Sequence, residues 1–510
     1  FEGNFRKEIY NTSHAKSEPH VHAIHSSLSA ALNADYQKIV RENREYIKTI
    51  AETLLLTATQ NIPQRGHNQT EGEIKGNFLS IMELLAKDDN QVKRKRIGQR
   101  NATYLGHSTQ NEIIDCLAEM VPTSIISEVS QTDAFSILVD ETKDISKKEQ
   151  KSFVIRYYYE GEIHESFLTF EAAERLDAAA LSQKVIQVLQ KYGLDYKKHL
   201  VVQAYDGASE MSVKNTGVQA RIKVEAPLAF YVHCNAHCLN LVLVDTVKSL
   251  PEAYCYLSLL QKVYVFVSGS YVHQMWLEVQ KEMFPGAAPR ELQRLIETRW
   301  ECSYKSCKTV MERLPAIIQL LTEISEDRNG DRAVEARGLL AQIDLKFAGL
   351  LVSFTKIFGE GNTDKESFRK VSFIPVVYVL LSEVKRRFSK ENCVIMEDIQ
   401  ALNPCSPTFC EKNTVFAFAS QYNCNSEDLE YELPQLKQIP ERKKTAVYSE
   451  VFDTMFKLCK IALALPVSTA SCEGSFSVLK LIKTHLRNTT SNERLSNLGV
   501  LGVESRRAGA

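Results

Sequence analysis

Several features are scarce in this chain of 510 residues, and each scarcity narrows the range of possible functions. Twelve cysteines are too few for a disulfide-bonded scaffold, so we expect reduced thiols, as in a cytosolic or nuclear protein. No run approaches the ~18 consecutive apolar residues of a membrane span, so we expect no membrane partner. The formal net charge of −1 gives no overall basic character, and any contact with nucleic acid must therefore come from local patches.

Two short apolar segments lead into an aspartate. Residues 135–139 precede Asp140, and residues 200–202 are closely followed by Asp206. Between them, a predicted hairpin at 152–159 and 163–172 and a predicted helix at 178–192 complete the order strand, hairpin, helix, strand. This is the order of an RNase H-like α/β core, a mixed sheet with flanking helices. In such a core the first and fourth strands are neighbours and bring the two aspartates together.

A third acid, Glu473, lies on a later predicted helix, after a break at Pro466. Two hard carboxylate ligands suit Mg²⁺ or Mn²⁺, and a third would complete a two-metal site for phosphoryl transfer. Each residue also has a simpler interpretation. Asp140 and Asp206 could be turn residues at strand ends, and Glu473 could complement the dipole of its helix.

The segment after residue 232 carries His233, Cys234, His237 and Cys238. Histidine and cysteine are zinc ligands, but four ligands within six residues cannot all point inward from one strand–helix junction. We therefore favour Cys234 and His237 as residues that support the neighbouring metal site, and we expect no zinc.

The remaining sequence suggests a core interrupted by a helical insertion. Residues 36–130 have helical spacing, and residues 131–250 form the first part of the core. Residues 251–455 are mostly helix-like, and residues 456–505 supply C-terminal helices that complete the core. Residues 1–35 form a polar arm. The basic run at 93–96 (KRKR) is either a nuclear-import signal or a solvated linker.

Several segments, in order, resemble the characteristic blocks of hAT-superfamily transposases. The match is closest to transposon-derived proteins that include the MYM-type and TTF-type zinc-finger proteins, and it covers roughly residues 36–505. The segments are FSILVDETKDISKKEQ, VVQAYDGASEMS, YVHCNAHCLNLVL, ETRWECSY and ALPVSTASCEGSFSVLKLIKTHLRNTTSNERLSNL.

The resemblance implies a role for particular residues. The family's DDE triad falls on Asp140, Asp206 and Glu473, and its Cys/Asp-x-x-His motif falls on Cys234 and His237. Its Arg-Trp pair falls on Arg299 and Trp300, where the tryptophan is expected to stack on an unpaired base during strand cleavage. From the residues alone, Trp300 could equally be part of the core. His14 and His20 resemble the tail of a TTF-type finger whose cysteine half is absent.

Two hypotheses for function follow. The first is a transposase-type enzyme that cleaves and transfers DNA strands with Mg²⁺ or Mn²⁺. The alternative is a domesticated or decayed relative that acts as a non-catalytic nuclear module for protein dimerization and DNA interaction. In both, the resemblance implies a homodimer, or a heterodimer with a relative, formed through the C-terminal region. The apolar stripe of this C-terminal region, which we expect to contribute to the interface, comprises Phe476, Leu479, Ile482, Leu486, Leu495, Leu498 and Leu501.

Overall fold

The computed structural model describes most of the chain, which divides into two compact units. Unit 1 comprises Phe1–Cys234 and Glu397–Ala510, and unit 2 comprises Asn235–Met396. The described residues are 34–65, 76–88, 103–173, 175–207, 211, 216–295, 300–326, 330–358, 374–387, 390–438 and 451–509. The predictions for His14, His20 and the basic run at 93–96 lie outside these residues.

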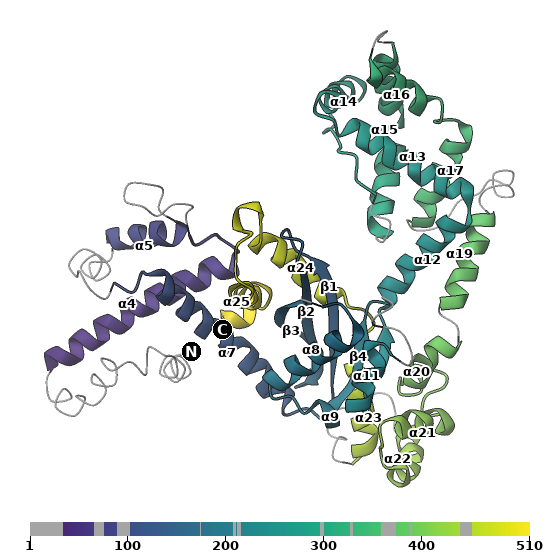
Figure 1. The fold of residues 1–510 in the computed structure, drawn as a ribbon. Coiled ribbons are helices and arrows are strands. Elements are labelled where there is room, and N and C mark those ends of the chain that lie inside the picture. Colours follow the sequence, from purple (N-terminus) through teal and green to yellow (C-terminus); the bar gives the residue numbers. More distant parts are fainter. Residues whose placement is uncertain are drawn as a thin grey trace. The chain divides into compact units, whose positions relative to one another are not determined.

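Unit 1 is built on a five-stranded mixed sheet with strand order β3-β2-β1-β4-β5 (Figure 1). The first three strands form an antiparallel meander, β4 runs parallel to β1, and β5 runs parallel to β4. This confirms the predicted mixed sheet and the adjacency of its first and fourth strands. The strands are β1 (Phe135–Lys143), β2 (Glu149–Tyr159), β3 (Glu162–Ala173), β4 (Leu200–Tyr205) and β5 (Phe230–His233).

Local sequence explains the connections between these strands. The turn from β2 to β3 has positive φ at both Glu160 (47°) and Gly161 (89°), as expected for a tight two-residue hairpin. Helix α8 (Ala178–Lys191) begins where Asp177 accepts a hydrogen bond from the backbone N–H of Ala180 at 3.1 Å. Its apolar residues recur with helical spacing and are buried, so this crossover helix packs on the core and leads into the short α9 (Tyr196–His199) and β4.

Other helices of unit 1 come from distant parts of the sequence. The N-terminal ones are α4 (Ala34–Thr59), α5 (Asn77–Asp88) and α7 (His107–Val129), and α11 (Val218–Glu225) precedes β5. After unit 2 come α21 (Lys412–Gln421), α22 (Ser426–Gln438), α23 (Asp453–Ala464), α24 (Ala470–Ile482), the 3₁₀ helix η5 (His485–Arg487), α25 (Asn492–Val503) and α26 (Ser505–Ala508).

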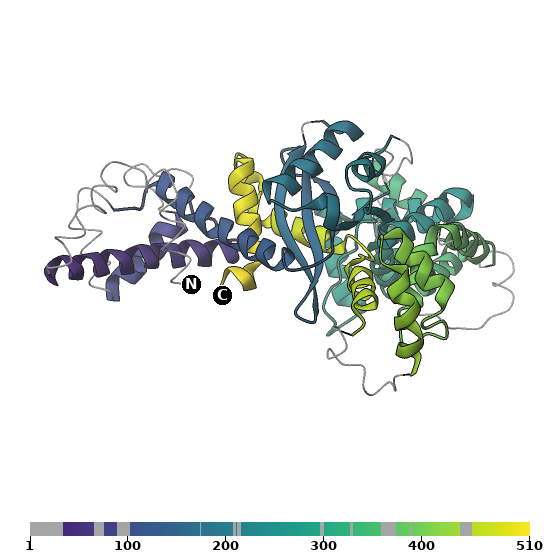
Figure 2. The same cartoon turned by 90° about the horizontal axis from the view of Figure 1, so that it is seen from below.

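The C-terminal apolar stripe is largely part of the core of unit 1. Helix α25 packs against α4, α7, α24 and β3, at the end of the sheet where Figure 2 shows it in yellow beside the N-terminal helices. Leu495 and Leu501 are fully buried there (each 0% exposed), and Phe476, Leu479 and Ile482 are buried on α24. These residues are therefore unavailable to a partner subunit, contrary to the expectation that they line an interface.

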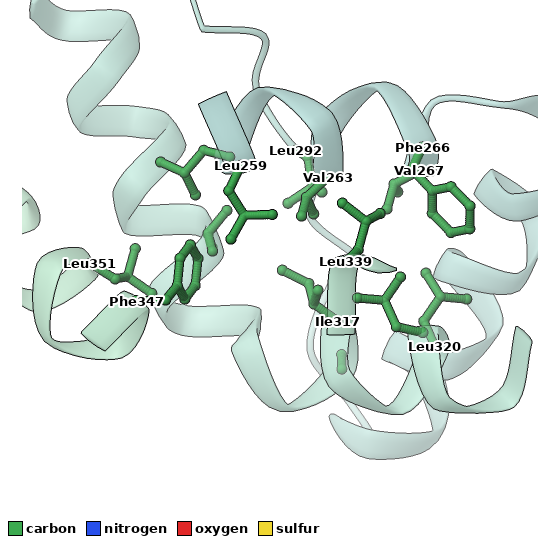
Figure 3. Packing of buried hydrophobic residues seen from close by; sticks show 14 of the residues in the cluster. Leu259, Val263, Phe266, Val267, Leu292, Ile317, Leu320, Leu339, Phe347 and Leu351 are labelled. Carbon is green, nitrogen blue, oxygen red and sulfur yellow. The ribbon is translucent and has the colours of Figure 1, made fainter. Parts of the chain in front are cut away.

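Unit 2 is helical in its described residues and has its own core. Its helices are α12 (Asn235–Ser249), α13 (Pro251–Val267), α14 (Ser270–Met283), α15 (Trp300–Ser325), α16 (Asp331–Leu340), α17 (Leu345–Phe358) and α19 (Ile374–Arg387); α20 (Lys390–Gln400) spans its end. Leu259, Val263, Ile317, Leu339 and Phe347 interdigitate at its centre (Figure 3). In the described part of the chain no single helix is long and apolar enough to span a membrane; α16 and α17 meet that test only as a pair bent by 72°.

The division into units differs from the expected boundaries at 251 and 455. At the first boundary, α12 packs against α19, where Arg386 and Arg387 both pair with Asp245, so unit 2 begins earlier. At the second, α22 belongs with unit 1. Its Glu432 accepts hydrogen bonds from the backbone N–H groups of Thr454 and Met455 (3.2 and 2.8 Å) at the start of α23. The inserted unit therefore both begins and ends earlier in the sequence than the helix-like stretch suggested.

Candidate functional site

Asp140 and Asp206 occupy equivalent positions on neighbouring strands. β1 and β4 run parallel, and Leu138 pairs with Ala204. Two residues further along each strand come Asp140 and Asp206, so both aspartates lie at the same edge of the sheet. Neighbouring strands are only about 4.8 Å apart. The apolar residues before each aspartate are buried, which fixes the strands, while the two aspartates are half-buried.

Glu473 approaches the same region from the first turn of α24, which packs against β1 and β2 (Figure 1). The residues around Glu473 hold the helix in place. Cys472 is fully buried, and its thiol donates to the carbonyl of Leu138 at 3.4 Å. The hydroxyl of Ser475 lies 2.8 Å from that of Ser152, the residue directly opposite Asp140 on β2. Glu473 itself is exposed.

Asp206 and Glu473 act electrostatically on Asp140. Burial is the largest cause that raises the pKa of Asp140, to about 7, and the negative charges of Asp206, Glu473 and Glu141 raise it further. A hydrogen bond from the backbone N–H of Glu141 (2.8 Å) opposes this shift. Glu141 is paired with the buried Lys151 at 2.6 Å. The structure thus gathers negative charge at the edge where the sequence predicted a site.

The oxygen atoms available at this edge are of the kind that binds a divalent metal ion. Carboxylate oxygens are the ligands that Mg²⁺ and Mn²⁺ prefer, and a cation between Asp140 and Asp206 would relieve the repulsion that raises the pKa of Asp140. The arrangement is not a closed three-ligand group. Among the described residues, no three His, Cys, Asp or Glu side chains are placed so as to hold a metal ion together. Asp140 and Asp206 are therefore the pair that would hold such an ion.

Cys234 links the strand that carries Asp206 to the helix that carries Glu473. Its backbone N–H donates to the carbonyl of Tyr205 at 3.0 Å, directly before Asp206. Its thiol sulfur accepts a hydrogen bond from the backbone N–H of Thr469 at 3.3 Å, and Thr469 is the N-cap residue of α24. Cys234 is almost fully buried, so these contacts are shielded from water. The predicted supporting role of Cys234 thus has a geometric basis.

The other predicted site residues are less informative. His237 lies near the start of α12, is half-buried and belongs to unit 2, whereas Cys234 ends the first segment of unit 1. Trp300 begins α15, but its side chain is not among those described, and Arg299 lies outside the described residues. The structure therefore leaves the predicted base-stacking role of this pair as a prediction.

Two contacts near the site escaped sequence reasoning. The side chain of Lys483 is 1% exposed and pairs at 2.6 Å with Asp144, whose side chain is 0% exposed, in the turn after β1. Gly207, directly after Asp206, lies so close to the imidazole of His233 that an added Cβ would overlap the ring. The local sequence predicts neither contact, because each contact joins segments that only the folded sheet brings together.

The three acids lie within two regions that match known protein families. Residues 4–217, which include Asp140 and Asp206, match the family model described as ZMYM1/FAM200, RNase-like domain. Residues 443–506, which include Glu473, match the hAT family C-terminal dimerisation region. Both regions are thus similar to those of hAT-like, transposon-derived proteins. The sheet of unit 1 is accordingly an RNase-like core completed by the C-terminal region.

The curated relatives of this hAT-like chain are repressors by name. It is 26% identical over 367 residues to the human protein called 52 kDa repressor of the inhibitor of the protein kinase, covering 67% of this chain and 48% of that protein. The mouse protein of the same name is 26% identical over 408 residues, covering 74% of this chain and 53% of the relative. The chain thus spans about half the length of the curated relatives it matches.

Proposed function

We propose that this hAT-like chain acts as a non-catalytic nuclear module that pairs with a second subunit and contacts DNA. The match of residues 443–506 to a dimerisation region is the observation that carries the proposal. The names of the human and mouse relatives, which describe repressors, favour regulation over transposition. The nuclear location and the DNA partner are proposed from this kinship and from the transposase-like core.

The surface proposed for pairing comprises Leu486, an exposed residue of the predicted stripe, and Leu481, which lies outside it. In the matched region, Leu481 near the end of α24 is 55% exposed, and Leu486 in η5 is 74% exposed. Solvent-exposed leucines contribute to association when a partner covers them, at about 25 cal/mol per Å² of buried apolar area. We place the subunit contact on these two leucines, because Leu495 and Leu501 are enclosed within unit 1.

Sedimentation of surface variants tests this proposal. Wild-type protein is expected to sediment as a dimer at micromolar concentration. The double variant Leu481→Glu, Leu486→Glu is expected to sediment as a folded monomer, because two carboxylates would have to be desolvated at the contact. Leu176→Glu is the matched control, since Leu176 is also exposed (45%) in unit 1 but lies outside the matched region. A monomeric wild type, or a dimer that survives the double substitution, would contradict the proposal.

Metal-dependent DNA cleavage is a second candidate, favoured by the negative charge gathered around Asp140. Asp140 and Asp206 would hold the ion, with Glu473 nearby and Cys234 keeping their supporting elements together. A bound magnesium ion would activate water or a 3′-hydroxyl and stabilise the leaving oxygen. Lys151 would keep Glu141 engaged, so that Glu141 does not compete for the same ion.

This candidate is tested by binding and activity together. Calorimetric titration should detect Mg²⁺ or Mn²⁺ binding to the wild type, and nicking of DNA that carries transposon ends should require the same ion. Asp206→Asn should weaken binding and abolish nicking without unfolding the chain. Asp195→Asn is the control, since Asp195 lies in unit 1 but at the N-cap of α9, before β4 begins. If Mg²⁺ binds the wild type and Asp206→Asn equally, the acidic pair is not a metal site.

A further inference from the structure

Two arginines lie close together where three helices of unit 1 meet. Both are distant in sequence from Asp140 and Asp206. Arg65 follows α4, and Arg494 lies in the first turn of α25. The first turns of α7 lie between them, because α4, α7 and α25 pack on one another (Figure 1, Figure 2). Arg65 thus lies near the start of the described chain, and Arg494 lies near its end.

Both guanidinium groups hold the same amide oxygen. Arg65 donates from Nη2 to Oδ1 of Asn111 at 2.6 Å and to the carbonyl of His107 at 3.3 Å. Arg494 donates to the same oxygen of Asn111 and to the side-chain oxygen of Gln64. Asn111 therefore orients two arginine side chains toward one another, although an amide oxygen carries no charge to neutralise them.

Neither arginine forms an ion pair with a described residue. No described carboxylate lies within salt-bridge distance of either one, and the buried Nε atom of Arg65 has no hydrogen-bond partner among the described residues. The charge of Asp115, one turn further along α7, raises the pKa of Arg494, but the carboxylate of Asp115 accepts a hydrogen bond from Asn497 at 2.6 Å. Glu112 and Glu493 act on Asp115 as well. Two half-buried positive charges thus remain without a counterion among the residues described.

Three further observations describe a positive field at this junction. Burial, and then the charge of Arg65, lower the pKa of Arg494 to about 10. Burial and both arginines lower the pKa of His107. In addition, α7 begins here without a side-chain N-cap at Gly106 and without an acidic residue in its first turn. The positive end of the helix dipole therefore adds to the two arginines instead of being offset.

We propose that Arg65 and Arg494 form a binding site for one phosphate group of a DNA backbone, a proposal that rests on the proposed DNA-interaction function. Arginine presents a planar set of N–H donors that matches phosphate oxygens, and each arginine keeps donors that Asn111 does not use. The uncapped start of α7 supplies the kind of environment in which anions bind. A phosphate would neutralise the pair and use the buried Nε–H of Arg65.

The first experiment measures thermal stability with inorganic phosphate, at an ionic strength held constant with chloride. Phosphate is expected to raise the melting temperature of the wild type. The effect should be lost in Arg65→Gln and in Arg494→Gln, and weakened in Arg494→Lys, which keeps the charge but not the planar fork. Arg175→Gln is the matched control, because Arg175 lies on the surface of unit 1 in an ion pair with Asp177. An equal phosphate effect in the wild type and both glutamine variants would overturn the site, as would no effect in the wild type.

The second experiment measures affinity for a short DNA duplex by fluorescence anisotropy across a salt series. Each glutamine variant is expected to bind about tenfold more weakly, with a salt slope smaller by about 1, as for one lost phosphate contact. Arg175→Gln should behave as the wild type. If the phosphate effect depends on the arginines but DNA affinity does not, the DNA assignment is overturned. If the wild type binds no DNA, the proposed DNA function fails, and the phosphate measurement still decides whether the anion site exists.

Discussion

At the scale of single residues, Asp144 and Lys483 show how a polar contact can hold a fold together. The carboxylate of Asp144 accepts hydrogen bonds from the backbone N–H groups of Ser146 and Lys148 and from the side chain of Gln150. Lys483, the C-cap residue of α24, donates a further hydrogen bond to the same carboxylate. A buried pair contributes little net stability, but removal of one partner leaves the other charge uncompensated. This pair anchors the end of the helix that carries Glu473.

The pair predicts a specific dependence of stability on pH. Burial alone would raise the pKa of Asp144, but the hydrogen bonds from Lys483, Lys148 and Gln150 and the charge of Lys483 lower it below the ordinary value. Because the folded-state pKa lies below the unfolded one, the stabilisation is complete above the unfolded pKa of about 3.9 and is lost as the pH falls through the folded pKa. Asp144→Asn should lower the free energy of unfolding at pH 7 by about 3 kcal/mol.

Urea unfolding of wild type and Asp144→Asn between pH 7 and pH 3 measures this effect. The difference between the two proteins should be constant from pH 7 to about pH 5 and shrink below about pH 4. Lys483→Met should destabilise the protein by a similar amount. A difference that stays the same down to pH 3 would mean that the ion pair does not contribute as described.

At the scale of elements, the contact between α25 and β3 depends on a glycine. An added Cβ at Gly499 would lie 2.6 Å from the ring of Phe170, which is buried and itself packs against Phe167 and Phe476. The ring cannot withdraw without disturbing this aromatic cluster. Gly499 therefore allows the helix to approach the sheet closely, and glycine is used here for space, since the residue lies within an ordinary helix.

We therefore predict that Gly499→Ala destabilises unit 1. The gain in helix propensity is at most about 1 kcal/mol, whereas overpacking a close contact costs about 1–3 kcal/mol. The matched control is Gly474→Ala in α24, where an added Cβ meets nothing within 4 Å, so stability should be unchanged or slightly increased. Thermal unfolding of both variants compares them directly. If the two variants melt at the same temperature, the α25–β3 contact accommodates the added Cβ without a loss of stability.

At the scale of the whole molecule, the C-terminal region completes the core of unit 1. The chain leaves unit 1 after Cys234 and returns at Glu397. The region matched to hAT dimerisation then packs α24 and α25 on the sheet and on the N-terminal helices. Its deletion would remove core residues such as Leu495 and Leu501 along with any subunit contact. For this reason the oligomeric state is better tested by substitutions at Leu481 and Leu486 than by truncation.

Much of the core was predictable because its signals are local. The apolar strand before Asp140, the Glu160-Gly161 turn and the spacing in α8 each depend on residues close in sequence. The adjacency of β1 and β4 then followed from the order of elements. Which side chains are exposed to solvent was less predictable from the sequence. Lys483 and Leu501 carry no local sign that one forms a buried ion pair and the other fills the core, because the segments that enclose them include ones more than a hundred residues away.

The sequence by itself determined the order of strands and helices, the family resemblance and the identity of the three acids, because periodicity and motif order are properties of the chain. Only the tertiary structure decided where unit 2 begins and ends, which leucines remain exposed, and that Arg65 and Arg494 share Asn111. The physical reason is that burial and charge compensation depend on all neighbours in space. That no described carboxylate pairs with Arg65 or Arg494 follows only from the placement of the residues around them.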